Sequence, residues 1–176
     1  VEMSNGNYLL VGYSNSFSLG DYDVFIAMVS AAGDLISLET YGGTDWDKAY
    51  GVCATIDGGY AIVGESFSYA NGVSQGLVIK LNASGNLEWI NNWGGAYNDG
   101  LKAVESLASG VLVTAGYTEE SPGDKNMWVM GVSVFGDSLW SKSMGTSATE
   151  EVLDLAVNSG QSIGLAGYTT RLGKAE

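Results

Sequence analysis

Three acidic residues recur at a nearly fixed interval and are the first candidates for chemistry in this sequence. Asp47, Asp99 and Glu150 lie 52 and 51 residues apart, and each comes just before a short run of small and apolar residues. Carboxylate oxygens are preferred ligands of Ca²⁺ and Mg²⁺, so one hypothesis is a cation site that these residues share. The alternative is that each side chain caps the amides of its own loop. Recurrence in every repeat favours the alternative, because a structural device recurs with the structural unit.

Asp45 adds a second carboxylate two residues before Asp47, with Trp46 between them. Acid–base hydrolysis of a glycosidic bond needs two carboxyl groups that face each other about 5–10 Å apart, and nothing in the sequence places a partner opposite Asp45. The chain contains no histidine, the most common general base. Cys53, the single cysteine, is expected to be a buried thiol and not a nucleophile. We therefore expect no catalytic residue.

Aromatic residues in or beside the expected loops could stack on a sugar ring. Tyr41 and Trp93 occupy equivalent repeat positions, so we expect them to pack between sheets. The other loop aromatics are Tyr22, Trp46, Tyr69 and Tyr97. Three of these, Trp46, Tyr69 and Tyr97, lie outside shared aromatic columns, and together with Asp45 they are the predicted ligand-binding residues.

Repeats of about 50 residues must position all of these side chains. The glycines at one strand end, Gly12, Gly64, Gly116 and Gly167, are 52, 52 and 51 residues apart. A period in this range is typical of a repeat architecture. The sequence indicates one domain, 1–176, with units at about 5–56, 57–108, 109–158 and a truncated 159–176.

Each complete unit contains four short segments with strand character, separated by Gly-containing turns. The predicted strands are 8–13, 23–30, 35–40, 49–55, 59–66, 76–82, 87–92, 101–107, 111–118, 127–134, 138–143, 152–158 and 162–169. The middle strands are apolar on both faces and must be covered on both sides. The pattern predicts an all-β fold, a β-propeller or partial propeller of four-stranded antiparallel blades, with about 3.5 blades in this chain.

Three phrases carry a resemblance to a known repeat family: DGGYAIVGESF (57–67), GLVIKLNASGNLEW (76–89) and WGGAYNDG (93–100). They resemble the bacterial and archaeal β-propeller repeats often found in secreted proteins and lipoproteins. The resemblance covers nearly the whole chain and implies the propeller fold and an extracellular, periplasmic or cell-surface location. It implies almost nothing about activity. The third unit departs most, with Val111-Leu112 in place of Gly-Tyr and Gly145-Thr146 in place of Gly-Gly.

The charge balance excludes some partners. With 7 basic and 20 acidic residues the net charge is −13, which argues against nucleic acid and against anionic membrane surfaces. No apolar run approaches the roughly 20 residues that span a bilayer, so we expect no membrane insertion.

These observations favour a non-enzymatic binding or structural module whose partners are proteins or carbohydrates. Contacts are expected on the loops 44–48, 67–75, 96–100 and 119–126. One alternative is a fragment of a glycan-active propeller enzyme, and another is an architectural subunit that forms rings or filaments by self-association. The first residues align with the end of an innermost strand, so we expect a piece of a longer chain. Association of two copies, giving about seven blades, is the alternative.

Overall fold

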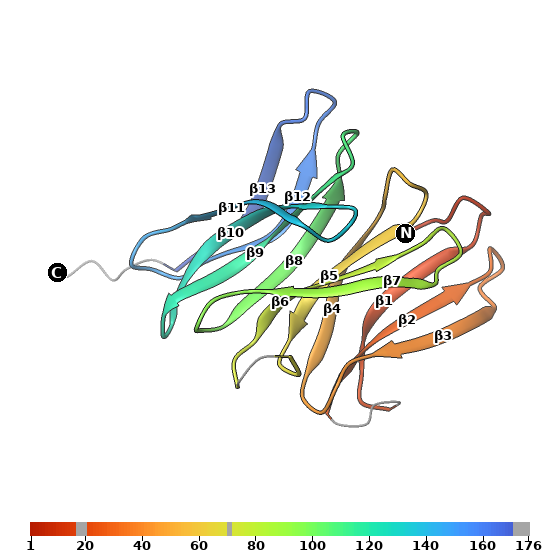
Figure 1. The fold of residues 1–176 in the computed structure, drawn as a ribbon, viewed down its shortest axis with the longest axis horizontal. Helices are drawn as coiled ribbons and strands as arrows, with labels where there is room; N and C mark the ends of the chain where they lie inside the picture. The colour runs from red at the N-terminus through yellow and green to blue at the C-terminus, as the bar shows by residue number, and fades with distance from the viewer. Residues whose placement is uncertain (17–20, 70–71, 171–176) are drawn as a thin grey trace.

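The structure is a computed structural model that describes residues 1–16, 21–69 and 72–170, and these residues form β-strands and no helix. Figure 1 shows the strands in chain order. They are β1 (Tyr8–Ser14), β2 (Asp23–Val29), β3 (Leu35–Tyr41), β4 (Asp47–Ala54), β5 (Tyr60–Ser66), β6 (Gln75–Leu81), β7 (Leu87–Trp93), β8 (Asp99–Ser106), β9 (Val111–Ser121), β10 (Asp124–Ser133), β11 (Ser138–Met144), β12 (Glu150–Val157) and β13 (Ile163–Thr169). Each predicted strand is present, so the all-β prediction is confirmed.

The strands form four antiparallel sheets in which chain neighbours are also sheet neighbours. Two sheets are complete four-stranded units, β4-β5-β6-β7 and β8-β9-β10-β11. They are flanked by the three-stranded β1-β2-β3 and the two-stranded β12-β13. The first strand of three sheets, β4, β8 and β12, carries a bulge at an equivalent place, between Ala49 and Gly51, Leu101 and Ala103, and Val152 and Asp154.

Tight turns set the strand register. Gly85 has φ +83°, a left-handed conformation that glycine adopts at little cost. The Asn82 carboxamide oxygen accepts hydrogen bonds from the amides of Ser84 and Asn86 at 2.9 and 3.0 Å, which closes the β6–β7 turn. Ser30 and Ser133 do the same with their hydroxyl groups in the two equivalent turns. The turn sequence therefore specifies each hairpin locally.

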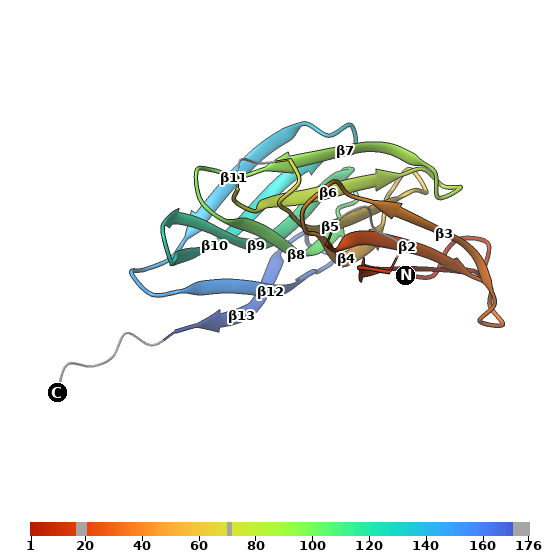
Figure 2. The ribbon, with the colours of Figure 1, turned by 90° about the horizontal axis from the view of Figure 1, so that it is seen from below.

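The sheets stack face to face, with a hydrophobic core between each consecutive pair (Figure 2). Tyr60 and Ile62 of β5 face β1-β2-β3, whereas Ala61 and Val63 face β8-β9-β10-β11, and all four are at most 2 % exposed. The small-residue strands β4, β8 and β12 run beside one another. Strands that are apolar on both faces thus lie between two sheets, as the sequence predicts.

Two boundaries differ from the prediction. The predicted loop 119–126 is wrong, because β9 and β10 continue to a tight turn at Pro122-Gly123, with Lys125 paired to Glu119. Gly123 has φ +81°, so the turn closes without a longer loop. Asp47, Asp99 and Glu150 are the first residues of β4, β8 and β12 and do not precede them. Parts of two other predicted segments, residues 70–71 and 171–176, lie outside the described residues.

Candidate functional site

The predicted cation ligands each hold the loop of their own repeat. The carboxylates of Asp47 and Asp99 accept hydrogen bonds from the amides of Gly43 and Gly95, at 2.9 and 2.6 Å. Glu150 accepts the amide of Thr146 at 3.1 Å. In the described part of the chain no three His, Cys, Asp or Glu side chains are grouped to hold a metal ion. The contacts therefore match the loop-capping alternative.

The environments of these carboxyl groups differ. Hydrogen bonds from the Thr146 hydroxyl and amide hold the pKa of Glu150 below its usual value. Burial raises the pKa of Asp99, although hydrogen bonds from Thr118 and from the Gly95 amide oppose that effect. Both groups act as acceptors for loop donors, which is a structural role.

Five aromatic rings follow one another in edge-to-face contact, and we call them the aromatic strip. In spatial order the strip consists of Tyr50, Tyr13, Tyr22, Trp46 and Phe67, with ring centroids 6.2, 5.6, 6.1 and 6.2 Å apart. Edge-to-face pairs of this kind contribute about 0.5–1.5 kcal/mol each beyond area burial. The strip is nonetheless open to solvent, since Tyr13, Trp46 and Tyr50 are 44 %, 44 % and 37 % exposed.

Lys48 sits on the aromatic strip. Its Nζ lies 4.2 Å from the centroid of the Trp46 ring, and 5.3 and 5.5 Å from those of Tyr13 and Tyr22. A cation over ring faces is attracted by their negative quadrupole. The ammonium group therefore orders three rings of the strip and places a hydrogen-bond donor beside them.

A shallow hollow of about 230 Å³ borders the strip and is lined by Asp21, Asp45, Trp46 and Phe67. The Trp46 indole Nε1–H donates a hydrogen bond to Asp21 at 2.8 Å, so two of the lining residues are bonded to each other. The structure thus brings together two of the four predicted ligand-binding residues, Asp45 and Trp46. Tyr69 and Tyr97, both described and exposed, are not among the residues that line this hollow.

Next to the strip lies a group of charged and phenolic side chains from successive sheets, which we call the inner cluster: Tyr50, Glu65, Lys102, Tyr117, Glu151 and Tyr168. Lys102 Nζ lies 3.6 Å from Glu65 and 3.8 Å from Glu151, and 3.6 Å from the centroid of the Tyr50 ring. Tyr50 and Tyr117 both donate to Glu65, at 2.5 and 3.1 Å. Tyr50 belongs to both groups, so the inner cluster fixes one end of the aromatic strip.

The inner cluster is suited to positioning and not to proton transfer. Burial, with the nearby Glu65, raises the pKa of Tyr50 and Tyr117 well above the usual phenol value, so both stay protonated donors at neutral pH. Burial lowers the pKa of Lys102, and Glu65 and Glu151 oppose that effect. The thiol of Cys53 offers no nucleophile either, because burial raises its pKa to about 12.

Sequence reasoning missed Tyr13 and Tyr50, whereas Lys48 and Phe67 lie in the predicted contact loops 44–48 and 67–75 but were not singled out as ligand-binding residues. A usable signal was present at one repeat position. The residue after the strand-end glycine is Tyr13, Glu65, Tyr117 or Tyr168 in the four units. All four belong to the aromatic strip or the inner cluster.

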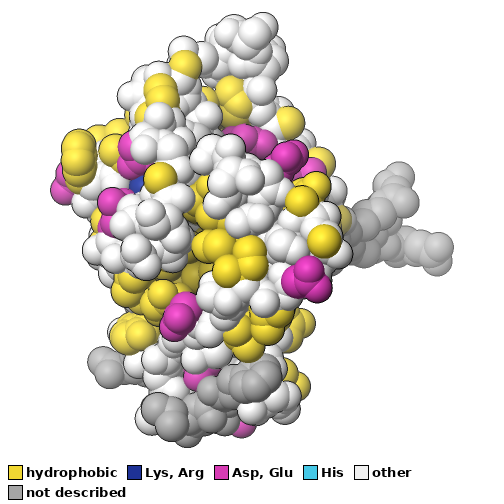
Figure 3. All heavy atoms as spheres, turned by 90° about the vertical axis from the view of Figure 1, so that its right-hand side faces the viewer, with side chains coloured by type: hydrophobic (Ala, Val, Ile, Leu, Met, Phe, Trp, Pro, Cys, Tyr) yellow, Lys and Arg dark blue, Asp and Glu magenta, His cyan; other side chains and the backbone are white. Residues whose placement is uncertain are grey.

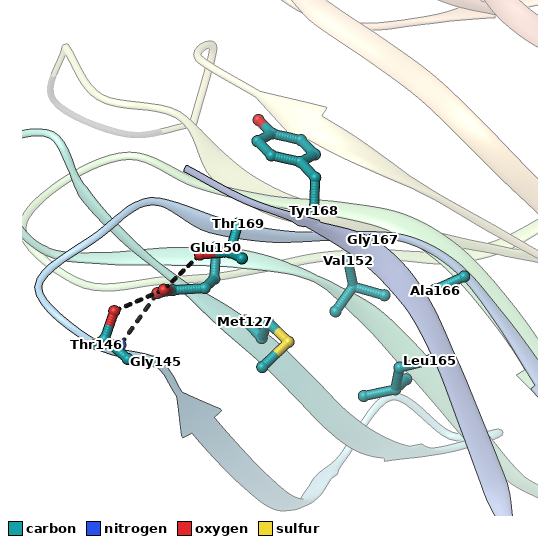
Figure 4. A pocket seen from close by; sticks show the side chains of 10 residues that line it. All are labelled: Met127, Gly145, Thr146, Glu150, Val152, Leu165, Ala166, Gly167, Tyr168 and Thr169. Carbon is teal, nitrogen blue, oxygen red and sulfur yellow. Dashed lines mark hydrogen bonds between the residues drawn. The ribbon is translucent and has the colours of Figure 1, made fainter. Parts of the chain in front are cut away.

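A larger hollow, of about 480 Å³, lies beside β13 and is lined in part by Met127, Val152 and Leu165 (Figure 4). The third strands β6 and β10 complete the sheets that contain β5 and β9. Among the described residues, no third strand completes the β12-β13 sheet. We interpret this hollow as an unfilled packing position and not as a ligand pocket.

Comparison with known proteins bears on the fold of this chain and not on its activity. No protein-family model matches the chain. It is similar to the regulatory protein FlaEY of Caulobacter vibrioides, with 24 % identity over 170 residues that cover 82 % of this chain and 18 % of that protein. The chain therefore spans less than a fifth of the length of this relative. A protein of unknown function from Bacteroides caccae has a similar structure, with a TM-score of 0.52 and 8 % identity over 88 % of this chain and 54 % of that one.

The likeness to the Bacteroides caccae structure concerns the fold alone and agrees with an all-β protein. In the described residues no helix is long and apolar enough to cross a membrane.

Proposed function

We propose that this protein is a non-enzymatic binding module of β-propeller architecture that recognises carbohydrate through the aromatic strip. One observation carries the proposal: the exposed ring of Trp46 lines a hollow together with Phe67 and the carboxylate groups of Asp21 and Asp45. Ligand sites commonly combine apolar or aromatic walls with a few polar groups that fix orientation.

The way the sheets repeat supports the propeller architecture. Each four-stranded sheet is an antiparallel meander whose first strand is rich in small residues and lies beside the first strands of its neighbours. Blades of a propeller are expected to pack in sequence around such strands. The repeat phrases and the net charge of −13 support a location outside the cytoplasm, in the periplasm, at the cell surface or outside the cell.

The aromatic strip suits a sugar better than a protein loop. The apolar C–H face of a pyranose can lie on an exposed ring of Trp46 or Tyr13, while the sugar hydroxyl groups reach polar atoms at the border of the hollow. Asp45 supplies acceptors in the hollow, and Lys48, whose Nζ lies 4.2 Å from the centroid of the Trp46 ring, supplies donors beside that ring. The rings are already held by edge-to-face contacts and by Lys48, so little ordering cost is expected on binding.

A glycan array probed with the labelled protein tests this proposal. We expect the wild-type protein to bind a set of related oligosaccharides. We expect Trp46→Ala to abolish this binding. The matched control is Trp140→Ala, which removes another exposed tryptophan, from β11, 36 % exposed against 44 % for Trp46. No bound glycan, or binding that survives Trp46→Ala, would contradict the proposal.

A glycan-active enzyme is the second candidate, because Asp21 and Asp45 line the same hollow. The hydrogen bond from Trp46 already engages the Asp21 carboxylate, which favours a structural role for that group. The two candidates are separated by assaying hydrolysis of aryl glycosides and of array hits. Turnover that is lost in Asp45→Asn, with binding retained, would establish the enzyme. Binding without turnover supports the binding module.

A further inference from the structure

The charged side chains that line the hollow beside the aromatic strip have the same sign. Asp21 and Asp45 supply carboxylate groups, and the other two lining residues are Trp46 and Phe67. Lys48 is not among the lining residues, although its Nζ lies 4.2 Å from the centroid of the Trp46 ring. A ligand that enters the hollow therefore meets aromatic rings and negative charge.

Asp45 is the carboxylate that a ligand can engage. Its backbone is held by Ser68, whose Oγ accepts a hydrogen bond from the Asp45 amide at 3.2 Å and donates one to Asp47 at 2.5 Å. In the part of the chain that the structure describes, no hydrogen bond or ion pair engages the Asp45 side chain. Asp21 accepts the indole N–H of Trp46 and adds its negative charge beside that ring. The hollow thus combines an anchored acceptor with a second carboxylate.

The rings of the aromatic strip already bind an ammonium group that belongs to the chain itself. Lys48 Nζ lies over the Trp46 ring, and 5.3 and 5.5 Å from the ring centroids of Tyr13 and Tyr22. Ring quadrupoles attract cations, and sites for cationic ligands use aromatic side chains for this reason. The same chemistry is open to the ammonium group of a ligand where Trp46 and Phe67 line the hollow.

The charge of the whole chain acts in the same direction. The net charge is −13. Figure 3 shows the side of the molecule that lies at the right in Figure 1, and among its coloured side chains acidic groups are spread over the surface while hardly any basic group is visible. A field of one sign raises the local concentration of oppositely charged ligands. A cationic glycan is therefore favoured over an acidic one before any contact forms.

We propose that the glycan bound at the aromatic strip contains amino sugars with a free, protonated amine, such as glucosamine residues. The inference rests on the proposed function and adds the class of sugar. The C–H face of the sugar stacks on Trp46, and its ammonium group reaches the Asp45 carboxylate near the charge of Asp21. At about 230 Å³ the hollow is smaller than the pockets of about 300–1,000 Å³ that enclose drug-sized ligands, so it holds one residue of a longer glycan.

Isothermal titration with a glucosamine tetramer and with its N-acetylated counterpart tests the charge preference. We expect the wild-type protein to bind the glucosamine tetramer about fivefold more tightly, the upper value for one exposed ion pair, and to lose most of that preference at about 1 M salt. Asp45→Asn keeps the size of the side chain and removes its charge, so the preference should fall below about twofold. The matched control is Asp34→Asn, which removes one charge from the exposed turn between β2 and β3 and should leave the preference unchanged.

Lys48→Gln should change the preference in the opposite direction. It removes the positive charge beside Trp46 and keeps a hydrogen-bond donor, so the preference for the glucosamine tetramer should rise. The ratio of the two affinities cancels any loss of order in the aromatic strip. A tetralysine peptide controls for charge alone and should not displace the glucosamine tetramer.

The outcomes separate this inference from the proposed function. Equal affinity for the two tetramers, with other glycans bound on the array, would overturn the inference and leave the proposed function intact. A preference that Asp45→Asn does not reduce, or displacement by tetralysine, would also overturn it. Tightest binding to uronic acid oligosaccharides, weakened by Lys48→Gln, would show that the ligand is acidic. Absence of any bound glycan would contradict both proposals.

Discussion

The strand-end glycines should divide into two classes when each is replaced by alanine. A Cβ on Gly64 would overlap the carbonyl oxygen of Lys48 in the paired first strand, and one on Gly116 would overlap that of Gly100. Gly12 belongs to β1-β2-β3, which has no such strand among the residues that the structure describes, and its Cβ would meet the Phe25 ring at 2.7 Å. Backbone atoms of a paired strand cannot yield without breaking the ladder, whereas a half-buried ring can turn. Alanine at this repeat position should therefore lower the free energy of unfolding more at Gly64 and Gly116 than at Gly12.

Overpacking typically costs 1–3 kcal/mol, and sometimes more where backbone must move. For Gly64→Ala and Gly116→Ala we expect a loss of about 3 kcal/mol in the free energy of unfolding. In a chain of this size that lowers the melting temperature by about 6–12 °C. Gly12→Ala should cost less than about 1 kcal/mol.

Gly95→Ala is the matched control for these variants. Nothing lies within 4 Å of its added Cβ and its φ is not positive, so alanine should be neutral or stabilise by about 0.4–1 kcal/mol through the unfolded state. Thermal and guanidinium unfolding followed by circular dichroism would give all four values. Melting temperatures of Gly64→Ala and Gly116→Ala within about 2 °C of Gly95→Ala would refute the argument.

Two further predictions concern the protonation of Asp57 and the reactivity of the Cys53 thiol. Although burial alone would raise it, hydrogen bonds from Thr55 and Lys80 hold the pKa of Asp57 below its usual value. The stability that Asp57 contributes is therefore present above its unfolded pKa, about 4, and is lost as pH falls through the lower folded pKa. Asp57→Asn should flatten this part of the acid dependence in urea titrations, and an unchanged slope would contradict the assignment. With a thiol pKa of about 12, Cys53 should react with Ellman's reagent at mildly alkaline pH only after unfolding, and rapid reaction of the native protein would show that the thiol is accessible.

The all-β fold and its antiparallel strands were readable from the sequence because their signals are local and repeated. Gly33, Gly85 and Gly136 mark equivalent turns, and all three have positive φ. Local sequence signals gave a wrong prediction at 119–126, where a proline and several charged residues suggest a loop. Strand pairing there continues past Glu119, which is buried, and local composition does not reveal that pairing.

The candidate site was only partly readable. Trp46 and Asp45 stood out because no other repeat shares them, and both line the hollow. Tyr13 and Tyr50 were missed because both lie in predicted strands, 8–13 and 49–55, and ligand candidates were sought only in or beside the expected loops. Their rings meet across sheets, at a centroid distance of 6.2 Å that depends on how one sheet stacks on the next. That stacking geometry is a property of the packed core and is not encoded in any single strand.

The central claim is that carbohydrate binds at the aromatic strip, and the indole N–H signals of the five tryptophans in ¹H–¹⁵N NMR spectra test it most directly. Trp46→Ala assigns the Trp46 signal by its disappearance. On titration with the strongest oligosaccharide from the array, we predict that the Trp46 indole signal shifts and that of Trp140 does not. A Trp46 signal that stays in place while the sugar binds would contradict the account.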